Sequence, residues 1–459
     1  MKKIMFFCIP AHGHHNPTLP VAAELVKKGN AVRYFSFEEF REKIENTGAE
    51  FIACDSFLPE LTKEQEEAVK NVSTTEMTIL DLQTTARMDG FLKEQVETFA
   101  PDVIVSDSVC FWGKLTARKY RIPLVTSTTT FAFNKYSSQY MKSSFAEIRD
   151  MMKGSKRVKA ELKKLEQYGY HEKSIMPLVQ NDNYSDTIVY ATKKYQPCSD
   201  TFSKHYAFVG PSVFSPGEPR KNRDRPLIFI SLGTVINDRP DFYHRCTEAL
   251  ADMDADVVIA CGRTMDPESL GRLPENIKVY PHVEQLDLLA RADVFLTHCG
   301  MNSVSESLLM ATPMVLFPQT NEQRAVAKRA EETGAGLLLK EDSAEAIRAA
   351  IDVVLKDRKY ADKAKECSED FRNAPGPEGA AEFIESAPHL MPEEDKRMIR
   401  NEILPGVFQL VFWIVAILLM VLLSKLPDFQ TWWILVWAVA ANVVFVPFKK
   451  LTLRMMKMI

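Results

Sequence analysis

The sequence predicts an α/β protein made of two doubly wound domains, followed by apolar segments that predict a transmembrane hairpin. Short apolar runs alternate with amphipathic stretches in both halves of the chain, which is typical of parallel sheets covered by helices on both faces. A proline-rich stretch at 211–226 separates the halves and reads as a linker. The length of 459 residues also exceeds that of one ordinary domain.

The first half predicts one domain over residues 1–210. Strands are expected at 2–9, 31–37, 101–107 and 122–128. Helices are expected at 19–29 and 111–120. A charged, helix-like stretch at 141–175 predicts an excursion from this sheet.

The alternation starts again after the linker and predicts a second domain over residues 227–390. Strands or strand ends are expected at 227–234, 254–262, 277–283, 292–300, 312–319 and 334–339. Residues 378–387 predict a helix that closes this domain. Each half therefore has the strands and helices for a core of its own.

Composition and charge exclude several classes of protein. A hydrophobic share of 46% with 26% charged residues is a globular composition. The formal net charge of -4 gives no electrostatic reason to expect nucleic acid as a partner. The eight cysteines contain no CxxC pair, so neither a zinc site nor a disulfide framework is expected. The first apolar run is cut at Pro10, which favours a buried strand over a signal peptide.

The apolar segments near the C-terminal end predict a transmembrane hairpin over residues 403–448. Residues 404–423 carry no charge and are long enough to cross a bilayer, and a second run follows at 431–448. A buried core hairpin is the alternative, although soluble cores seldom need so long an uncharged run. The basic residues that flank the two runs are Lys396, Arg397, Arg400, Lys449, Lys450, Arg454 and Lys457. By the positive-inside rule, both termini are expected in the cytoplasm, at the cell membrane.

The second domain contains a predicted anion site at the end of one strand. The strand at 292–300 ends near His298, and a glycine-containing turn leads into a helix that begins near Asn302 and Ser303. Ligands of open α/β sheets bind outside the carboxyl ends of strands, and a helix N-terminus suits a phosphate or diphosphate. Glu306, one turn further on, can accept hydrogen bonds from ribose hydroxyls. Taken singly, Ser303 is equally explained as a helix cap and Glu306 as a solvated helix residue.

Four short motifs extend this site along the chain: THCGMNS at 297–303, ATP at 311–313, PQTNEQ at 318–323 and TGAG at 333–336. Together with Glu306 they resemble the donor-binding signature of the UDP-glycosyltransferases, which include plant secondary-metabolite and bacterial macrolide transferases. The resemblance extends from the first strand to about residue 386. It implies the GT-B fold, in which two Rossmann-like domains face a cleft. It also implies transfer of a hexose, with glucose favoured, from a UDP-sugar to a hydroxyl of a small apolar acceptor.

The resemblance further implies which residues bind the nucleotide sugar. His298, Asn302 and Ser303 are expected to hold the diphosphate, and Glu306 the ribose. The segment at 231–234 is expected to add a second phosphate contact. The whole expected set is Ser231, Gly233, Thr234, His282, Val283, Gln285, His298, Gly300, Asn302, Ser303, Glu306, Glu322 and Gln323.

Part of this set departs from the family pattern. Glu322 and Gln323 match the acidic residue and glutamine that bind sugar hydroxyls. His282, however, stands where the family often has a tryptophan that stacks on uracil, and an imidazole offers less stacking area. Glu284 replaces a common proline, and Ala311 replaces a usual glycine.

The loop after the first strand contains three histidines and supplies a candidate base. Transfer to a hydroxyl requires removal of its proton, and a histidine oriented by a carboxylate suits this task. Asp107 ends a strand of the same sheet and is expected on the same edge. The family pattern GHxNP matches residues 13–17, so the resemblance assigns the base to His14 and its partner to Asp107. His12 and His15 remain rivals, and a metal site is disfavoured because no carboxylate accompanies the loop.

The resemblance implies a single displacement with inversion at the sugar C1 and without a metal cofactor. His14 takes the acceptor proton, while the helix N-terminus, His298 and Ser303 hold the charge of the leaving UDP. A Rossmann oxidoreductase is excluded, because the loop after the first strand lacks GxGxxG. The alternatives left open are a glycolipid-forming membrane transferase, a nucleotide-sugar epimerase and a non-catalytic nucleotide-sugar-binding membrane protein.

The acceptor is expected to contact the segments at 55–90 and 131–180. Their methionine, phenylalanine and tyrosine content indicates an apolar or lipid-like molecule. The expected cytoplasmic placement differs from that of the family's animal members, which suggests a bacterial origin.

Overall fold

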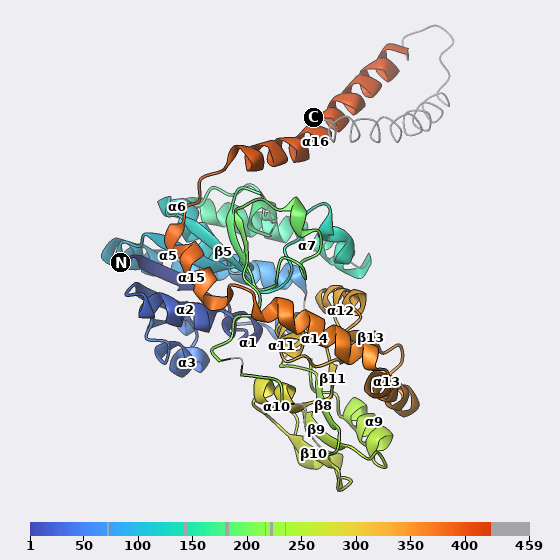
Figure 1. Cartoon of the computed structure of the whole chain (residues 1–459). Coiled ribbons are helices and arrows are strands. Elements are labelled where there is room, and N and C mark those ends of the chain that lie inside the picture. The colour runs from blue at the N-terminus through green and yellow to red at the C-terminus, as the bar shows by residue number, and fades with distance from the viewer. Residues whose placement is uncertain are drawn as a thin grey trace. The chain divides into compact units, whose positions relative to one another are not determined.

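The computed structural model describes residues 1–70, 73–141, 145–179, 183–215, 217–220, 224–234 and 236–423. Within this part of the chain the first sheet, to which the strand labelled β5 in Figure 1 belongs, has seven parallel strands in the order β3-β2-β1-β4-β5-β6-β7. These strands are β1 Lys3–Phe7, β2 Ala31–Ser36, β3 Glu50–Ala53, β4 Val103–Asp107, β5 Leu124–Thr128, β6 Asp186–Val189 and β7 Tyr206–Phe208.

The second sheet has, among the same described residues, six parallel strands in the order β10-β9-β8-β11-β12-β13. They are β8 Leu227–Ser231, β9 Asp256–Ala260, β10 Ile277–Tyr280, β11 Val294–Thr297, β12 Met314–Leu316 and β13 Gly336–Leu338. Every strand expected from the sequence is confirmed. Two parallel sheets, each with its own helices, confirm the predicted α/β class.

Helices connect the strands in both halves of the chain. In the first half they are α1 His12–His15, α2 Thr18–Lys27, α3 Arg41–Glu45, α4 Lys63–Lys70, α5 Thr74–Phe99, α6 Phe111–Tyr120, α7 Phe145–Leu165 and α8 Met176–Val179. Later helices are α9 Pro240–Leu250, α10 Gln285–Arg291, α11 Met301–Leu309, α12 Asn321–Thr333, α13 Ala344–Lys356, α14 Arg358–Arg372, α15 Gly376–Ser386 and α16 Glu393–Leu423. The stretch expected as a helical excursion at 141–175 contains α7.

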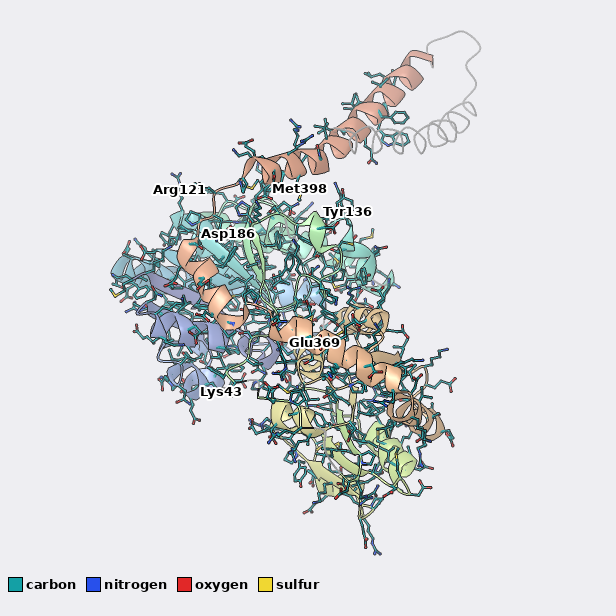
Figure 2. The ribbon with its side chains drawn as sticks, in the orientation of Figure 1. Lys43, Arg121, Tyr136, Asp186, Glu369 and Met398 are labelled. Atoms are coloured by element: carbon teal, nitrogen blue, oxygen red, sulfur yellow. The ribbon has the colours of Figure 1, made fainter. Side chains whose placement is uncertain are left out.

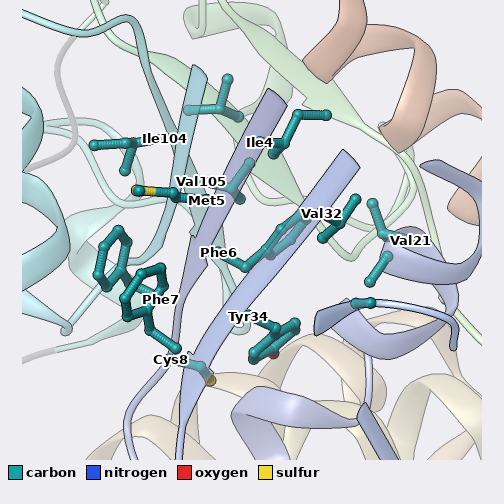
Figure 3. Close-up of a cluster of buried hydrophobic side chains, with 14 of the residues drawn as sticks. Ile4, Met5, Phe6, Phe7, Cys8, Val21, Val32, Tyr34, Ile104 and Val105 are labelled. Carbon is teal, nitrogen blue, oxygen red and sulfur yellow. The ribbon is translucent and has the colours of Figure 1, made fainter. Parts of the chain in front are cut away.

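The first core forms around the central strand β1. This strand lies between β2 and β4, and four of its five residues are buried, so its sequence is apolar almost throughout. Phe6 stacks on Tyr34 with ring centroids 5.4 Å apart (Figure 3), and Phe7 stacks on Phe35 at 4.5 Å. These stacked pairs hold β1 and β2 in register.

The strand registers decide which loops share an edge. Phe7 pairs with Ser106, so the loop after β1 and the end of β4 at Asp107 emerge side by side. In the second sheet Thr297 pairs with Ser231, so the turns after β11 and β8 also share an edge. Because all these strands are parallel, the candidate residues gather at the carboxyl ends of two sheets.

The helix predicted to close the second domain packs instead against the first core. Residues 376–386 form α15, as expected, but Ala380, Ala381 and Ile384 are fully buried in the cluster around β1. The Asn30 side-chain amide donates to Glu385 at 2.7 Å. The chain therefore returns to the first domain after completing the second sheet.

Residues 200–204 and the described residues from Leu390 to Leu423 form a separate unit. The first predicted membrane segment lies within α16, whose opening turns carry charged residues such as Glu393 and Lys396. Among the described helices none is long and apolar enough to cross a membrane, so the structure does not support the predicted hairpin. The second predicted segment, 431–448, lies outside the described residues.

Candidate active site

His15 anchors the histidine loop to the first core. Its side chain is fully buried, and its Nδ1–H donates to the Ala11 carbonyl at 3.0 Å while its Nε2 accepts from the Ser36 hydroxyl at 2.5 Å. The ring stacks flat on Phe40 with centroids 3.6 Å apart. Burial lowers the pKa of His15 to about 4, although the hydrogen bond from its ring to the Ala11 carbonyl opposes this shift. Both ring nitrogens are engaged, so His15 has a structural role.

His12 also differs from a base oriented by a carboxylate. Its ring meets Phe40 edge-on, with centroids 4.9 Å apart. Burial, followed by the positive charge of Lys43 on α3 (Figure 2), lowers the pKa of His12. Within the described residues, no carboxylate forms a hydrogen bond with this ring.

His14 pairs directly with Asp107. The Nδ1 atom of His14 lies 2.6 Å from Oδ2 of Asp107, whose side chain is 1% exposed, while the His14 side chain is 26% exposed. The other carboxylate oxygen of Asp107 accepts from the Val109 N–H at 2.8 Å. The carboxylate is thus fixed, and Nδ1–H of His14 donates to it, which leaves Nε2 as the nitrogen that can accept a proton.

The charges around His14 favour its protonated form. Burial lowers its pKa, but the charge and hydrogen bond of Asp107, with a smaller effect of Glu322, raise it above 6.5. The Thr129 hydroxyl lies 3.2 Å from Nδ1. Thr129 was not predicted from the sequence, although its place just after β5 puts it on the same sheet edge.

His298 of the second domain is held between two glycines. A Cβ atom at Gly233 would lie 2.4 Å from the His298 ring, and one at Gly300 would lie 2.6 Å from its Nε2. Only glycine therefore leaves room for the ring at this position. Burial lowers the pKa of His298 to about 4, so the imidazole is neutral at pH 7. Its Nδ1 is buried and has no hydrogen bond of ordinary geometry, although the Ser231 backbone partly opposes the lowering of the His298 pKa.

The N-terminus of α11 lies directly after this histidine. Gly300 is the N-cap and has no side chain to satisfy the first N–H groups. The first intrahelical bond of this end runs from the Val304 N–H to the Gly300 carbonyl at 3.0 Å, so the preceding N–H groups lie outside the helical ladder. Ser303 is inside the helix and is not its cap. A helix end of this kind, beside a neutral imidazole, suits a diphosphate.

Gln285, Ser303 and Glu306 form a hydrogen-bonded group. The Gln285 side-chain N–H₂ donates to Glu306 at 2.7 Å and to the Ser303 hydroxyl at 3.3 Å. Burial raises the pKa of Glu306 to about 7, and the Gln285 hydrogen bond opposes this shift. Glu306 is therefore not a solvated helix residue. The structure brings together three residues that were expected to bind the nucleotide.

Asn302 connects the second domain to the histidine loop. Its side-chain amide donates to the carbonyl of Gly13, the residue before His14, at 2.8 Å. The end of α11 and the candidate base are thus joined by one hydrogen bond. This geometry places the predicted diphosphate site and the predicted base beside each other.

The start of α12 positions the two residues expected to bind sugar hydroxyls. Gln323 and Thr320 form a capping box, in which Oε1 of Gln323 accepts from the Thr320 N–H at 3.1 Å. The Gln323 carbonyl oxygen is therefore used by the helix, and its N–H₂ group is the part that could reach a sugar. Glu322 is exposed, and its charge acts on His14.

The remaining predicted residues lie near the same sheet edge. Ser231 is buried, and its hydroxyl accepts from the Gly233 N–H at 3.2 Å, whereas Thr234 is exposed. His282 and Val283 lie between β10 and α10. The His282 side chain is 63% exposed, and its Nε2 lies 3.8 Å from a carboxylate oxygen of Glu284.

Candidate metal ligands do not converge in this site. Across the part of the chain that the structure describes, no group of three or more His, Cys, Asp or Glu residues could hold a metal ion. The three loop histidines instead face different partners: His12 meets Phe40, His14 meets Asp107, and His15 meets Ser36.

Known proteins are similar in sequence to this chain over most of its length. Residues 244–386 match the family model described as erythromycin biosynthesis protein CIII-like, C-terminal domain. The chain is 34% identical over 402 residues to the NDP-glycosyltransferase YjiC of Bacillus licheniformis, covering 84% of this chain and 97% of that protein. It is 30% identical over 400 residues to the demethyllactenocin mycarosyltransferase of Streptomyces fradiae, covering 84% and 86%.

Solved structures agree on the architecture. The crystal structure of the glycotransferase of kitacinnamycin superposes with a TM-score of 0.71 at 26% identity, covering 84% of this chain and 98% of that one. The match extends over nearly the whole length of that protein.

Proposed function

Because the chain belongs to the NDP- and UDP-glycosyltransferase family and has its GT-B fold, we propose that it transfers a hexose, with glucose favoured, from a UDP-sugar to a hydroxyl of a small apolar acceptor. Membership of this family makes the protein an enzyme that uses a nucleotide sugar. The observation that carries the proposal is the 2.6 Å contact between His14 and the buried carboxylate of Asp107. It is the geometry that a base for hydroxyl activation requires.

The proposed reaction is a single displacement at the sugar C1. Nε2 of His14 accepts the proton of the acceptor hydroxyl as its oxygen forms a bond to C1. The bond from C1 to the β-phosphate oxygen breaks at the same time, and its electron pair leaves with UDP. The N–H groups at the start of α11 and the neutral His298 stabilise that charge.

The residues around Glu306 support a nucleoside next to the diphosphate. The Gln285 side chain donates a hydrogen bond to the Glu306 carboxylate at 2.7 Å. Ribose hydroxyls could replace Gln285 as donors to this carboxylate. The exposed ring of His282 is the proposed platform for uracil. Glu322 and Gln323 are the proposed ligands of the sugar hydroxyls, through the carboxylate and the N–H₂ group respectively.

Exposed apolar side chains support an apolar acceptor. They belong to the segment at 131–180 that the sequence assigned to the acceptor side, and Tyr136 is labelled in Figure 2. The exposed members are Tyr136, Met141, Ile148, Met151, Met152, Tyr168, Met176 and Val179. Their concentration in one segment of the chain supports an acceptor that is apolar at least in part.

The function is tested by a transfer assay with paired donors and a chelator. Purified protein is expected to glycosylate aromatic or macrolide alcohols from UDP-glucose, with lower kcat/KM for dTDP-glucose, as followed by mass spectrometry. EDTA should leave the rate unchanged, because the helix terminus and His298 hold the diphosphate in place of a metal.

Three results of this assay would contradict parts of the proposal. A strict need for Mg²⁺ or Mn²⁺ would refute the metal-free account. UDP-glucose binding without transfer or hydrolysis would favour the non-catalytic alternative, and transfer only to lipid acceptors would favour the glycolipid alternative. The predicted localisation at a bacterial cell membrane, with cytoplasmic termini, stays a prediction.

A further inference from the structure

Lys114 is a buried cation directly behind the candidate base pair. It lies on α6, and its side chain is 6% exposed. Its ammonium donates to the carbonyls of Ser108 and Leu178, each at 2.5 Å. A lysine is seldom buried without a specific set of partners, because desolvating its charge is costly.

The Ser108 carbonyl belongs to the turn that orients Asp107. Within this turn the Val109 N–H donates to the Asp107 carboxylate at 2.8 Å, and the Cys110 N–H donates to the Asp107 carbonyl at 3.1 Å. Lys114 therefore hydrogen-bonds to Ser108, which lies between Asp107 and Val109, the residue whose N–H donates to the Asp107 carboxylate. The second carbonyl that accepts from Lys114 belongs to Leu178 of α8, within the segment at 131–180 that is expected to contact the sugar acceptor.

The close packing of α6 fixes the position of this lysine. A Cβ atom at Gly113, the preceding residue, would lie 2.4 Å from the Ser106 hydroxyl and 2.7 Å from Cβ of Phe7. The first turn of α6 thus lies directly on β1 and β4. This contact fixes the backbone of Lys114 next to the Asp107 turn.

Titratable groups from three elements face the ammonium. Asp107 comes from β4 and Asp81 from α5, while Cys110 precedes α6 and Arg118 lies in its last turn. Burial raises the pKa of Asp81 and of Cys110 well above their ordinary values, so Asp107 is the main negative charge near Lys114. Burial lowers the pKa of Lys114 to about 8, and Asp107 is the strongest of the groups that oppose this shift. The amine is therefore mostly charged at pH 7.

The same carboxylate connects the cation and the histidine electrostatically. His14 faces the carboxylates of Asp107 and Glu322, which together stabilise its protonated form. Lys114 also interacts with the charge of Asp107, and a cation that does so weakens the negative potential that this carboxylate exerts on a neighbouring imidazole.

We propose that Lys114 is a positioning residue for the base, which holds the Asp107 turn in place and allows His14 to lose its proton at a lower pH than Asp107 alone would permit. Because Lys114 also grips Leu178, the same cation connects the acceptor-side segment to the turn. This inference rests on the proposed role of His14.

The test is the pH dependence of kcat/KM for transfer from UDP-glucose in variants of the full chain. Lys114→Met removes the charge and the donors, and should move the acidic limb upward by about half to one pH unit. It should also lower the plateau kcat by about tenfold, because the turn after Asp107 loses its hydrogen bond from Lys114. Lys114→Gln keeps an N–H₂ donor without the charge, so the limb should shift as in Lys114→Met with a smaller loss of kcat.

Two further variants serve as controls. Lys114→Arg keeps the charge and should keep the wild-type acidic limb. Lys119→Met removes a lysine of the same helix that pairs with Asp89 instead, and should leave both kcat and the limb unchanged. The KM for UDP-glucose should stay constant throughout.

The result that overturns the inference is a folded Lys114→Met or Lys114→Gln protein with the wild-type acidic limb. Folding is checked by circular dichroism and thermal melting. His14→Ala, measured in parallel, separates the two claims. If it kept wild-type turnover, the base assignment itself would fail, whereas an unchanged limb in the lysine variants alone refutes only the role of Lys114.

Discussion

His14→Ala is expected to lower kcat for sugar transfer by about two to four orders of magnitude, the usual contribution of a general base. The substitution removes Nε2, the nitrogen available to the acceptor proton, while Nδ1 serves only to hold the ring against Asp107 at 2.6 Å. UDP binds to the other domain in the proposed mechanism. Its affinity, measured by calorimetry, should therefore remain within about twofold of wild type.

His12→Ala is the matched control for this result. His12 belongs to the same short helix but meets Phe40 instead of a carboxylate. Its substitution should leave kcat close to wild type. A large loss of kcat in His12→Ala, together with wild-type turnover in His14→Ala, would transfer the role of base to His12.

Gly300→Ala is expected to weaken UDP binding by about 10- to 100-fold, which corresponds to about 1.4 to 2.8 kcal/mol. The added Cβ would lie 2.6 Å from Nε2 of His298, so the ring has to leave its place beside the start of α11. The backbone of Gly300 has φ -62, which alanine adopts without strain. The loss of affinity would thus report the position of His298 and not a distorted helix start.

Gly90→Ala provides the control, because nothing lies within 4 Å of a Cβ at that position. It should bind UDP as wild type does. Calorimetry with UDP gives the affinities, and thermal melting shows whether each variant is folded. Wild-type affinity in folded Gly300→Ala would contradict the placement of the diphosphate beside His298.

The two sheets could be predicted because their strands are buried on both faces. Strands such as β1 and β11 are continuous apolar runs, and such runs are visible in one sequence. The short strands β3, β6 and β7 were not expected, since three or four residues carry too little periodicity. The packing of α15 on the first core could not be predicted either, because the pattern of a helix shows its apolar face but not its partner.

The candidate site was predictable where strand order alone decides it. His14 and Asp107 follow neighbouring parallel strands, so the sequence predicts their shared edge. Two hydrogen bonds could not be predicted, because they depend on side-chain directions that residue spacing in the sequence does not determine. They run from Gln285 to Glu306 and from Lys114 to the Ser108 carbonyl. The same is true of Gly300, whose need for glycine follows from the position of a ring.

The anomeric configuration of the first-formed product tests the central claim most directly. If His14 deprotonates the acceptor while its oxygen attacks C1 and UDP leaves, the configuration at C1 must invert in one step. An α-linked UDP-glucose donor should therefore give a β-glucoside, identified by proton NMR from the coupling of its anomeric hydrogen. An α-glucoside as the first product would contradict the single displacement, and with it the role assigned to the His14–Asp107 pair.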